Sequence, residues 1–334
     1  MKRIMAVYDV DPLYAERFAE FANRTGSAPL KAVAFTSIKR LREYAGQEGV
    51  ELLLVGDEVT DEELRGVNAG QIIRLSETGV VKDESPTIYK YQASDSVLRE
   101  VMACYQTGAE PELLTAAGPR SRIIGVYSPI ARCGKTSFAF TLGQALARDG
   151  KALLLSLEEF SGLACLTGTA YEGGLSDLLY YYRQGEYSRL RLASVVYNRG
   201  GLDYVPPVTY AEDLALFKGA ELSGLIERIA GEGIYDEIVL DLGHFTGGVE
   251  EELKICDVIY VPVKEDAVSA AKLKEWREYL EKSGRDRLWE KVRILKLPRP
   301  NATAGCETYL EQLLWGEMGD FVRELIGGAG RGGV

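Results

Sequence analysis

Histidine is almost absent from this sequence, and cysteine is sparse. One histidine and five cysteines occur in 334 residues, and no two cysteines have the C-x-x-C spacing of a zinc or iron–sulfur site. We therefore expect reduced, buried thiols, and a reductase that shares an iron–sulfur cluster across a dimer is excluded. His244 is predicted to be a turn or interface residue, not a metal ligand. The cysteines are Cys104, Cys133, Cys165, Cys256 and Cys306.

Long apolar runs and an excess of basic residues are also lacking. No apolar run approaches the roughly 18–20 residues of a membrane span, and the start, MKRIMAVYDVD, lacks the apolar centre of a signal peptide. We expect a cytoplasmic protein without direct membrane insertion. The 39 Lys and Arg against 50 Asp and Glu give a net charge of −11, which argues against specific nucleic-acid binding. The length suits two domains.

The most informative stretch is RIIGVYSPIARCGKTSFAF, which begins at Arg122. An apolar strand is predicted to enter a loop there, and Gly134-Lys135-Thr136 then opens a helix, as in a phosphate-binding loop. Gly134 would let the backbone approach the phosphates, Lys135 would reach the β- and γ-phosphates, and Thr136 would ligate Mg²⁺. The first glycine of G-x-x-x-x-G-K-[ST] is replaced by Pro129. The candidate phosphate-binding residues are Arg132, Cys133, Gly134, Lys135, Thr136 and Ser137.

Acidic residues end two of the predicted strands that follow. The strand at 152–157 ends in Glu158-Glu159, and the strand at 236–241 is nearly all apolar and ends in Asp241. Beside a phosphate-binding loop, Asp241 would hold the metal directly or through water. The alternative is an ordinary turn or helix-capping aspartate.

Residues 1–106 alternate short apolar strands with helical patterns, which predicts a doubly wound parallel sheet. Asp9 and Asp11 end the first strand, Ser76 the fourth and Lys90 the fifth. This pattern resembles a response-regulator receiver domain, but Gly56 stands at the phosphoacceptor place, with Asp57 one residue late. We interpret the region as an atypical receiver-like domain lacking the phosphoacceptor, with Asp9, Asp11 and Lys90 left as a solvated charge cluster.

The rest of the chain divides into a linker, a second α/β domain and a tail. Residues 107–121 are predicted to be the linker, 122–326 the second doubly wound domain, and 327–334 a glycine-rich tail. Strands are expected in the second domain at 122–127, 152–157, 194–197 or 202–205, 236–241, 256–263 and 292–297, and helices at 135–148, 175–183, 212–230, 267–282 and 307–326.

With these motifs in place, residues 122–326 resemble the MinD/ParA class of P-loop ATPases, which have a deviant Walker A loop. The order of domains, a receiver-like domain ahead of such an ATPase, resembles the TadZ/CpaE proteins of Flp-type (Tad) pilus assembly. The resemblance implies two three-layer α/β/α domains, ATP and Mg²⁺ as ligands, and catalytic roles for Lys135, Glu158 and Asp241. Glu158 takes the place of the family's switch I acid and would orient the attacking water.

The chain departs from the family at several of these places. The deviant loop reads K-G-G-x-G-K-[ST], and its signature lysine, which reaches a dimer partner's phosphates, is Ile130 here. Arg132 would supply a similar charge or is a plain surface residue. Glu158 is one methylene longer than the family's aspartate, and Ser156 replaces another aspartate. These changes are expected to slow hydrolysis more than binding.

Three further features are less specific. Pro298 and Arg299 lie where the family's base-binding strand ends and would pack on adenine, or they form a plain strand exit. The segment LLYYYR at 178–183 is aromatic on adjacent helix faces, so part of it should be exposed at a protein interface or between domains. The amphipathic last helix is acidic, so we expect it to pack on its domain and not on a membrane.

Together these features predict an ATP-binding, weakly hydrolysing localisation or scaffold protein. It would be a homodimer that works with pilus or secretion machinery proteins and is recruited to the inner face of the membrane or to a cell pole. Two alternatives stay open: a ParA-type partition ATPase that binds DNA non-specifically, and a pseudo-ATPase that serves only as an interaction module.

Overall fold

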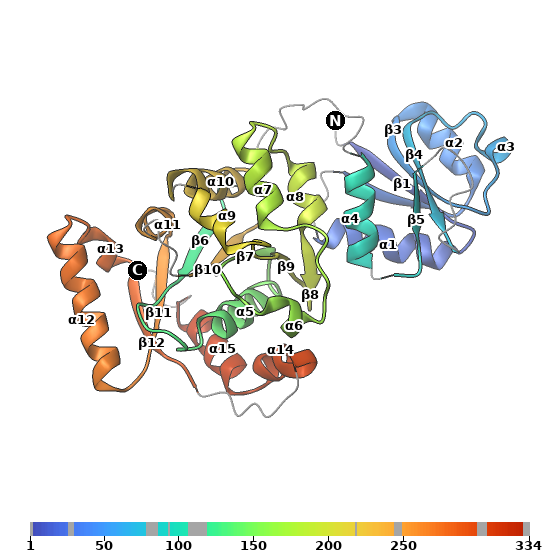
Figure 1. Ribbon diagram of the computed structural model, residues 1–334. Helices are drawn as coiled ribbons and strands as arrows, with labels where there is room; N and C mark the ends of the chain where they lie inside the picture. Colours follow the sequence, from blue (N-terminus) through green and yellow to red (C-terminus); the bar gives the residue numbers. More distant parts are fainter. Residues whose placement is uncertain are drawn as a thin grey trace. The chain divides into compact units, whose positions relative to one another are not determined.

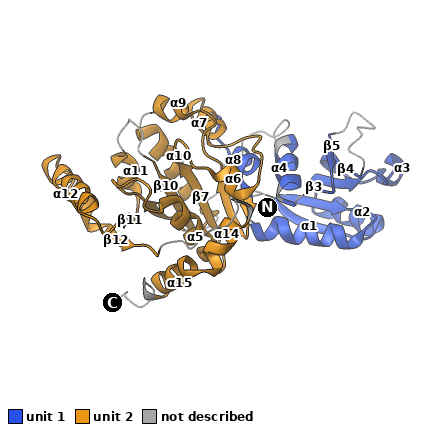
Figure 2. Cartoon of the chain, turned by 60° about the horizontal axis from the view of Figure 1, so that its bottom comes forward, with its two compact units in different colours: residues 1–113, 186–197 blue, residues 114–185, 198–334 orange. Residues whose placement is uncertain are grey.

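The chain forms two compact units, each built on its own parallel sheet. The computed structural model describes residues 3–25, 30–77, 86–92, 94–105, 119–217, 219–243, 249–298 and 306–329. Unit 1 comprises residues 1–113 with 186–197, and unit 2 comprises 114–185 with 198–334 (Figure 2). The prediction of two doubly wound α/β units is confirmed.

Unit 1 has a five-stranded parallel sheet in the order β2-β1-β3-β4-β5 (Figure 1). This is the flavodoxin-like order, in which ligands gather at the carboxyl ends of the strands. The strands are β1 (Ile4–Tyr8), β2 (Lys31–Phe35), β3 (Val50–Gly56), β4 (Ala69–Ser76) and β5 (Thr87–Tyr89), and the helices are α1 (Pro12–Thr25), α2 (Ile38–Gln47), α3 (Asp61–Leu64), α4 (Ser94–Tyr105) and α8 (Arg189–Val195).

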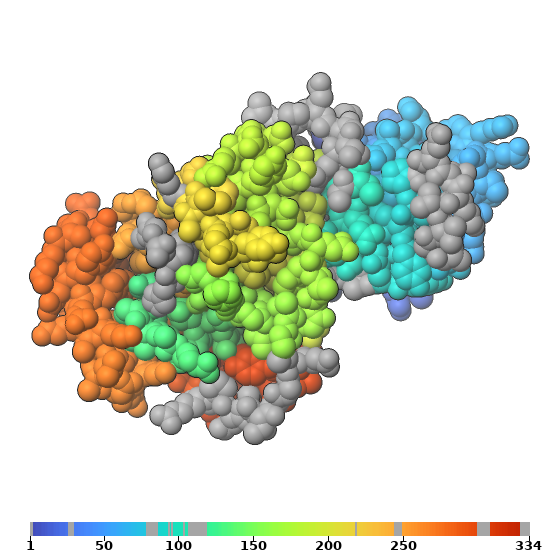
Figure 3. Space-filling view, in the orientation of Figure 1, coloured from blue at the N-terminus to red at the C-terminus, as the bar shows by residue number. Residues whose placement is uncertain are grey.

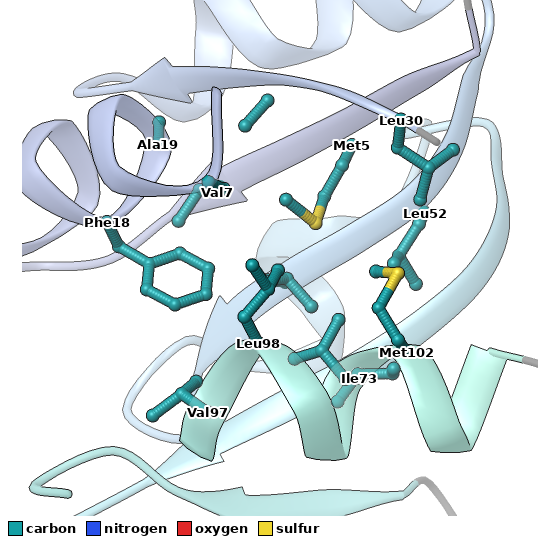
Figure 4. Packing of buried hydrophobic residues seen from close by; sticks show 14 of the residues in the cluster. Met5, Val7, Phe18, Ala19, Leu30, Leu52, Ile73, Val97, Leu98 and Met102 are labelled. Carbon is teal, nitrogen blue, oxygen red and sulfur yellow. The ribbon is translucent and has the colours of Figure 1, made fainter. Parts of the chain in front are cut away.

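Alternate residues of the strands build a core on each face of this sheet. Met5 and Val7 of β1 pack with Phe18 of α1 and Leu98 of α4 (Figure 4). Ala6 of the same strand lies in a second cluster on the opposite face, with residues of α2. Because strand side chains alternate between faces, the nearly all-apolar strands predict helices on both sides of the sheet, as observed.

One helix of unit 1 comes from the middle of the sequence. Residues 186–197 cluster with unit 1, although the sequence boundaries place them in the second domain. Ala193 of α8 is buried in the core cluster that also holds Val97 and Val101 of α4. The guanidinium of Arg99 lies 4.0 Å above the Tyr197 ring.

Unit 2 has a seven-stranded sheet in the order β12-β11-β6-β10-β7-β9-β8. Helices α5, α14 and α15 lie on one side of it, and α7, α10 and α11 on the other (Figure 1). Its elements are β6 (Arg122–Val126), α5 (Lys135–Leu146), β7 (Ala152–Leu157), α6 (Leu163–Thr167), α7 (Leu175–Arg183), β8 (Tyr197–Arg199), β9 (Leu202–Val205), α9 (Ala211–Leu216), α10 (Gly219–Gly231), β10 (Glu237–Leu242), α11 (Glu250–Ile255), β11 (Val258–Val263), α12 (Ala267–Lys282), α13 (Arg287–Glu290), β12 (Val292–Lys296), α14 (Cys306–Trp315) and α15 (Glu317–Ala329).

In unit 2, two predicted helices are divided, one alternative is decided, and the short elements α6, β8, α11 and α13 were not predicted. Of the two alternatives for the third strand, 202–205 is right, and the 194–197 segment is mostly the end of a helix. The helix expected at 212–230 is two helices, α9 and α10. The helix expected at 307–326 is also two, because the chain breaks at Gly316, where a Cβ atom would lie 2.7 Å from the Gln312 carbonyl oxygen.

The last two helices pack on unit 2, as predicted. Leu310, Leu313 and Met318 are buried, and the Phe321 ring meets the Phe138 ring of α5 edge to face at 6.5 Å. Among the described residues, no helix is long and apolar enough to cross a membrane.

Candidate functional site

The loop between β6 and α5 is held in a defined shape by its own residues. Ser128 donates a hydrogen bond to the Pro262 carbonyl (2.6 Å) and accepts one from the Ile130 N–H (3.1 Å). Gly134 caps α5 with φ 91°, a conformation that favours glycine, and a Cβ atom there would lie 3.3 Å from Leu297 Cδ1. The first N–H groups of α5 therefore face the end of this loop, where a helix attracts anions.

Two residues of the loop stand where the signature lysine and the glycine two places after it would be. Ile130 is buried, so that place offers neither charge nor access. Arg132 is exposed, lines the cavity described below, and has φ 53°. A non-glycine residue in this left-handed region costs about 1 kcal/mol, and the resembled loop has glycine at the same place. Arg132 is thus a cation at the mouth of the site, held in a backbone conformation better suited to glycine.

Lys135 is paired with Glu158 across the site. Its ammonium lies 2.9 Å from Glu158 Oε1, and the two side chains are only 8% and 18% exposed. Lys135 is the first residue of α5, the helix that follows β6, and Glu158 directly follows β7. Strands β6 and β7 are the two neighbours of β10 in the sheet. The lysine predicted to bind phosphates is therefore neutralised by the acid predicted to orient water.

Asp241 lies in the strand between them and is buried, and neither of its carboxylate oxygens has a partner at normal hydrogen-bond geometry among the described residues. Its register partners are Val126 of β6 and Ser156 of β7, and Ser156 Oγ is also buried and has no hydrogen-bond partner in the described part of the chain. Burial, followed by the charge of the Glu158 carboxylate, raises the pKa of Asp241 to about 7, against the opposing effects of the Thr136 hydroxyl and Lys135. Unpaired buried oxygens of this kind are the donor set that a hard cation such as Mg²⁺ takes.

A cavity of about 1130 Å³ opens beside the loop, and Asp241 and Ser156 are not among its lining residues. It is lined by every predicted phosphate-binding residue, by Glu158 and by Pro298. Arg299 and His244 lie outside the described residues. The lining residues are Arg132, Cys133, Gly134, Lys135, Thr136, Ser137, Glu158, Ser161, Gly162, Cys165, Leu166, Val263, Lys264, Glu265, Asp266, Lys296, Leu297, Pro298, Tyr309 and Met318.

Sequence reasoning missed the residues that α6, α14 and α15 bring to the cavity. Tyr309 of α14 shares a hydrogen bond of 2.9 Å with Ser137, and the two residues are 172 positions apart in the sequence. Met318 and Leu166 add apolar surface. The only signal for Tyr309 is a polar aromatic residue on the amphipathic last helix, which does not distinguish a ligand contact from core packing.

In the described part of the chain, no three His, Cys, Asp or Glu side chains group together as they would at a metal site. The cysteines agree only partly with the expectation of buried thiols. Cys133 and Cys256 are buried, Cys104 is half-buried and Cys165 is exposed.

The acidic cluster of unit 1 is not solvated, so that expectation is wrong. Asp9 and Lys90 are both buried, with the Lys90 ammonium 3.4 Å from Asp9 Oδ1 and 2.8 Å from Glu77 Oε1. The cluster is buried because Asp9 follows the inner strand β1 and because Tyr14 and Tyr91 flank the Lys90 ammonium. Only Asp11 is exposed, where its carboxylate accepts the Leu13 N–H of α1.

We expect acetyl phosphate with Mg²⁺ to leave Asp57 unmodified. Gly56 holds the acceptor place, and a Cβ atom there would lie 2.9 Å from Asp9 Oδ2, so the place has no room for a side chain. Asp57 instead accepts a hydrogen bond from Ser76 (2.8 Å), and Lys90 is occupied by Asp9 and Glu77. Intact-mass spectrometry, with an active receiver domain treated in parallel, measures this. One phosphate on Asp57 would contradict the interpretation.

The tyrosine-rich segment of α7 is exposed in part, as predicted. Leu178 and Leu179 are buried and Tyr180 is exposed. Helix α9 lies beside α7. Ser176 of α7 donates a hydrogen bond to Asp213 of α9 (2.6 Å), and Arg183 of α7 donates one to the carbonyl of Leu216 in α9 (2.8 Å). The two helices adjoin on the face of unit 2 shown in Figure 3.

Comparison with solved structures finds P-loop ATPases of the MinD and ParA kind. A Borrelia burgdorferi plasmid partition protein (BB_S35) bound to AMPPNP is 16% identical, covering 62% of this chain and 89% of that one, with a TM-score of 0.43. MinD from Pyrococcus horikoshii with Mg-ADP is 17% identical (56% and 73% covered, TM-score 0.41), and apo McdA from Cyanthece is 15% identical (62% and 99%, 0.46). No protein-family model and no curated protein matches the chain.

Proposed function

We propose that unit 2 binds ATP with Mg²⁺ and hydrolyses it slowly. One observation carries the proposal: Lys135, Thr136 and the rest of the loop that opens α5 line a cavity of about 1130 Å³, and the buried Asp241 lies in β10, between β6, which leads into this loop, and β7. This volume suits a small-molecule ligand, and the helix start and Lys135 suit its phosphates.

Each residue would have a defined role. Lys135 would bind the terminal phosphates once Glu158 releases it. Thr136 and Asp241 would hold Mg²⁺, Asp241 directly or through water, and the metal would neutralise charge on the phosphates. Leu297 and Pro298 would pack on the base. Glu158 would orient water, and its extra methylene and its bond to Lys135 are the reasons to expect slow turnover.

Calorimetric titration with Mg-ATP, combined with light scattering for mass, tests the proposal. Binding at micromolar concentration that weakens when EDTA removes the metal is the expected result. No binding to the wild-type protein would reject the ATPase and leave a pseudo-ATPase that serves as an interaction module.

Replacement of Glu158 by glutamine should tighten ATP binding about tenfold, or ~1.4 kcal/mol, while it slows hydrolysis. The variant frees Lys135 and removes a negative charge beside the incoming phosphates. Glu159→Gln makes the same change of charge one residue away, outside the cavity lining, and is the matched control. Calorimetry and a phosphate-release assay give both quantities. Unchanged affinity in Glu158→Gln would show that the ion pair does not compete with nucleotide.

We further propose that the protein is a localisation or scaffold factor of the TadZ/CpaE kind, which assembles as a homodimer with pilus or secretion machinery. The support is a flavodoxin-like unit 1 ahead of a unit that carries a phosphate-binding loop. Unit 1 would direct docking at the inner membrane face or a cell pole, since its phosphoacceptor place is Gly56. An ATP-dependent doubling of mass supports the dimer. A salt-sensitive shift of DNA in a gel would favour a ParA-type partition ATPase instead.

A further inference from the structure

Two hydroxyl groups from distant parts of unit 2 meet at the cavity. Ser137 lies in the first turn of α5, Tyr309 lies in α14, and their oxygens are 2.9 Å apart. Both residues line the cavity. Tyr309 is fixed there because its neighbour Leu310 is buried and α14 packs against both α5 and α6.

The pair has one proton more than its own hydrogen bond uses. A serine and a tyrosine hydroxyl carry two protons, and the bond between them needs one. The second proton is available to an acceptor in the cavity, whichever oxygen donates within the pair. A hydroxyl that donates to an anionic oxygen makes a stronger bond than one that donates to a neutral acceptor.

The position of Ser137 on the helix decides which part of a nucleotide the pair would meet. Residues two apart on a helix do not share a face, so Ser137 and Lys135 point to different parts of the ligand. Lys135 lies against Glu158, the acid placed to orient the attacking water, and serves the terminal phosphates. The hydroxyl groups of Ser137 and Tyr309 would then bind the phosphate next to the nucleoside.

We propose that Tyr309, together with Ser137, binds the α-phosphate of the nucleotide, so that the C-terminal helices complete the phosphate site. This inference rests on the proposed function. It predicts that Tyr309 contributes equally to the binding of ATP and ADP, because both carry an α-phosphate. A tyrosine that contacted the γ-phosphate would affect ATP alone.

Calorimetry with Mg-ATP and Mg-ADP on Tyr309→Phe and Ser137→Ala tests it. Tyr309→Phe keeps the ring and removes only the hydroxyl. We expect both affinities to fall about tenfold in each variant, as for the loss of one hydrogen bond to a charged group. Tyr180→Phe, at an exposed tyrosine of α7, is the matched control and should bind as the wild type does.

The outcomes separate the two proposals. If the wild-type protein binds neither nucleotide, both the proposed function and this inference fail. If the wild-type protein binds nucleotide and Tyr309→Phe binds both ATP and ADP as tightly as the wild type does, only the inference fails. The Ser137–Tyr309 bond then only fastens α14 to α5, which a lower melting temperature without loss of affinity would show. A loss confined to ATP would overturn the assignment to the α-phosphate.

Nitration of the wild-type protein gives a second measurement if a variant does not fold. Tetranitromethane modifies accessible tyrosines, and mass spectrometry of peptides locates them. Mg-ADP should slow nitration of Tyr309 and leave that of Tyr180 unchanged. Equal rates at Tyr309 with and without saturating Mg-ADP would count against contact.

Discussion

Replacement of Lys135 by alanine should reduce ATP affinity by roughly a hundredfold. The ammonium is the cation that the structure places at the start of α5, and hydrogen bonds between charged groups contribute up to about 3 kcal/mol. Its loss also leaves Glu158 and Asp241 as neighbouring acids without their cation, which further opposes an anionic ligand. Calorimetry with Mg-ATP on the two proteins measures the effect.

Lys296→Ala is the matched control for this experiment. Lys296 lines the same cavity, but its side chain is 71% exposed and pairs with Glu265 at the surface. An exposed pair contributes at most about 1 kcal/mol, so affinity should change by less than about fivefold. If Lys135→Ala bound ATP as well as Lys296→Ala does, Lys135 would not be the phosphate-binding residue.

Replacement of Asp241 by asparagine should stabilise the nucleotide-free protein at pH 8. The pKa of this buried carboxyl rises from 3.8 to about 7 on folding, which corresponds to roughly 4 kcal/mol. Between these values the folded state holds a proton that the unfolded state has lost, so stability falls as the pH rises through this window. Above pH 7 the cost is complete, and asparagine avoids it. Urea unfolding at pH 4 and pH 8 should show a difference between the two proteins only at pH 8.

The same change should remove the Mg²⁺ dependence of ATP binding, because the metal loses its buried acid. Subtraction of the two pH profiles cancels the contribution of other acids, including Glu252, whose pKa burial also raises to about 7. Asp203→Asn is the control, since the Asp203 carboxylate accepts from Asn198 (2.7 Å) and from the Tyr235 hydroxyl (3.1 Å). That variant should destabilise by about 1–3 kcal/mol. Destabilisation by Asp241→Asn at pH 8 would contradict the account.

Local signals predicted most of the fold. Runs such as Leu52–Val55 and the nearly all-apolar strand that ends in Asp241 indicated inner strands of parallel sheets. Gly134 marked the start of α5. The break at Gly316 was missed because an isolated glycine in an apolar helical pattern does not by itself end a helix, and the helix at 189–195 was missed because it depends on packing against a distant segment. Helical periodicity identifies an apolar face but not the surface that covers it.

The part of the candidate site that belongs to a single sequence motif was predictable. The residues of the loop and Asp241 follow from the order of strand, loop and helix. The pairing of Lys135 with Glu158 joins the first residue of α5 to the end of the next strand, β7, and depends on how the helix packs on the sheet, so no spacing rule reports it. The burial of Asp9 with Lys90 was missed for a related reason: charge in a sequence predicts exposure unless a partner is known.

The return of the chain from unit 2 to unit 1 at residues 186–197 makes neither unit a continuous piece of the polypeptide. The chain passes between the units three times, near residues 113, 185 and 197. A protease cut between residues 105 and 119 would therefore not release the N-terminal fragment, because the apolar face of α4 would still be covered by α8. If the gene were divided at the same point, the N-terminal product would lack α8, and the C-terminal product would carry α8 with its apolar face uncovered. The separable folding entities of this protein are defined by packing and not by the order of its residues.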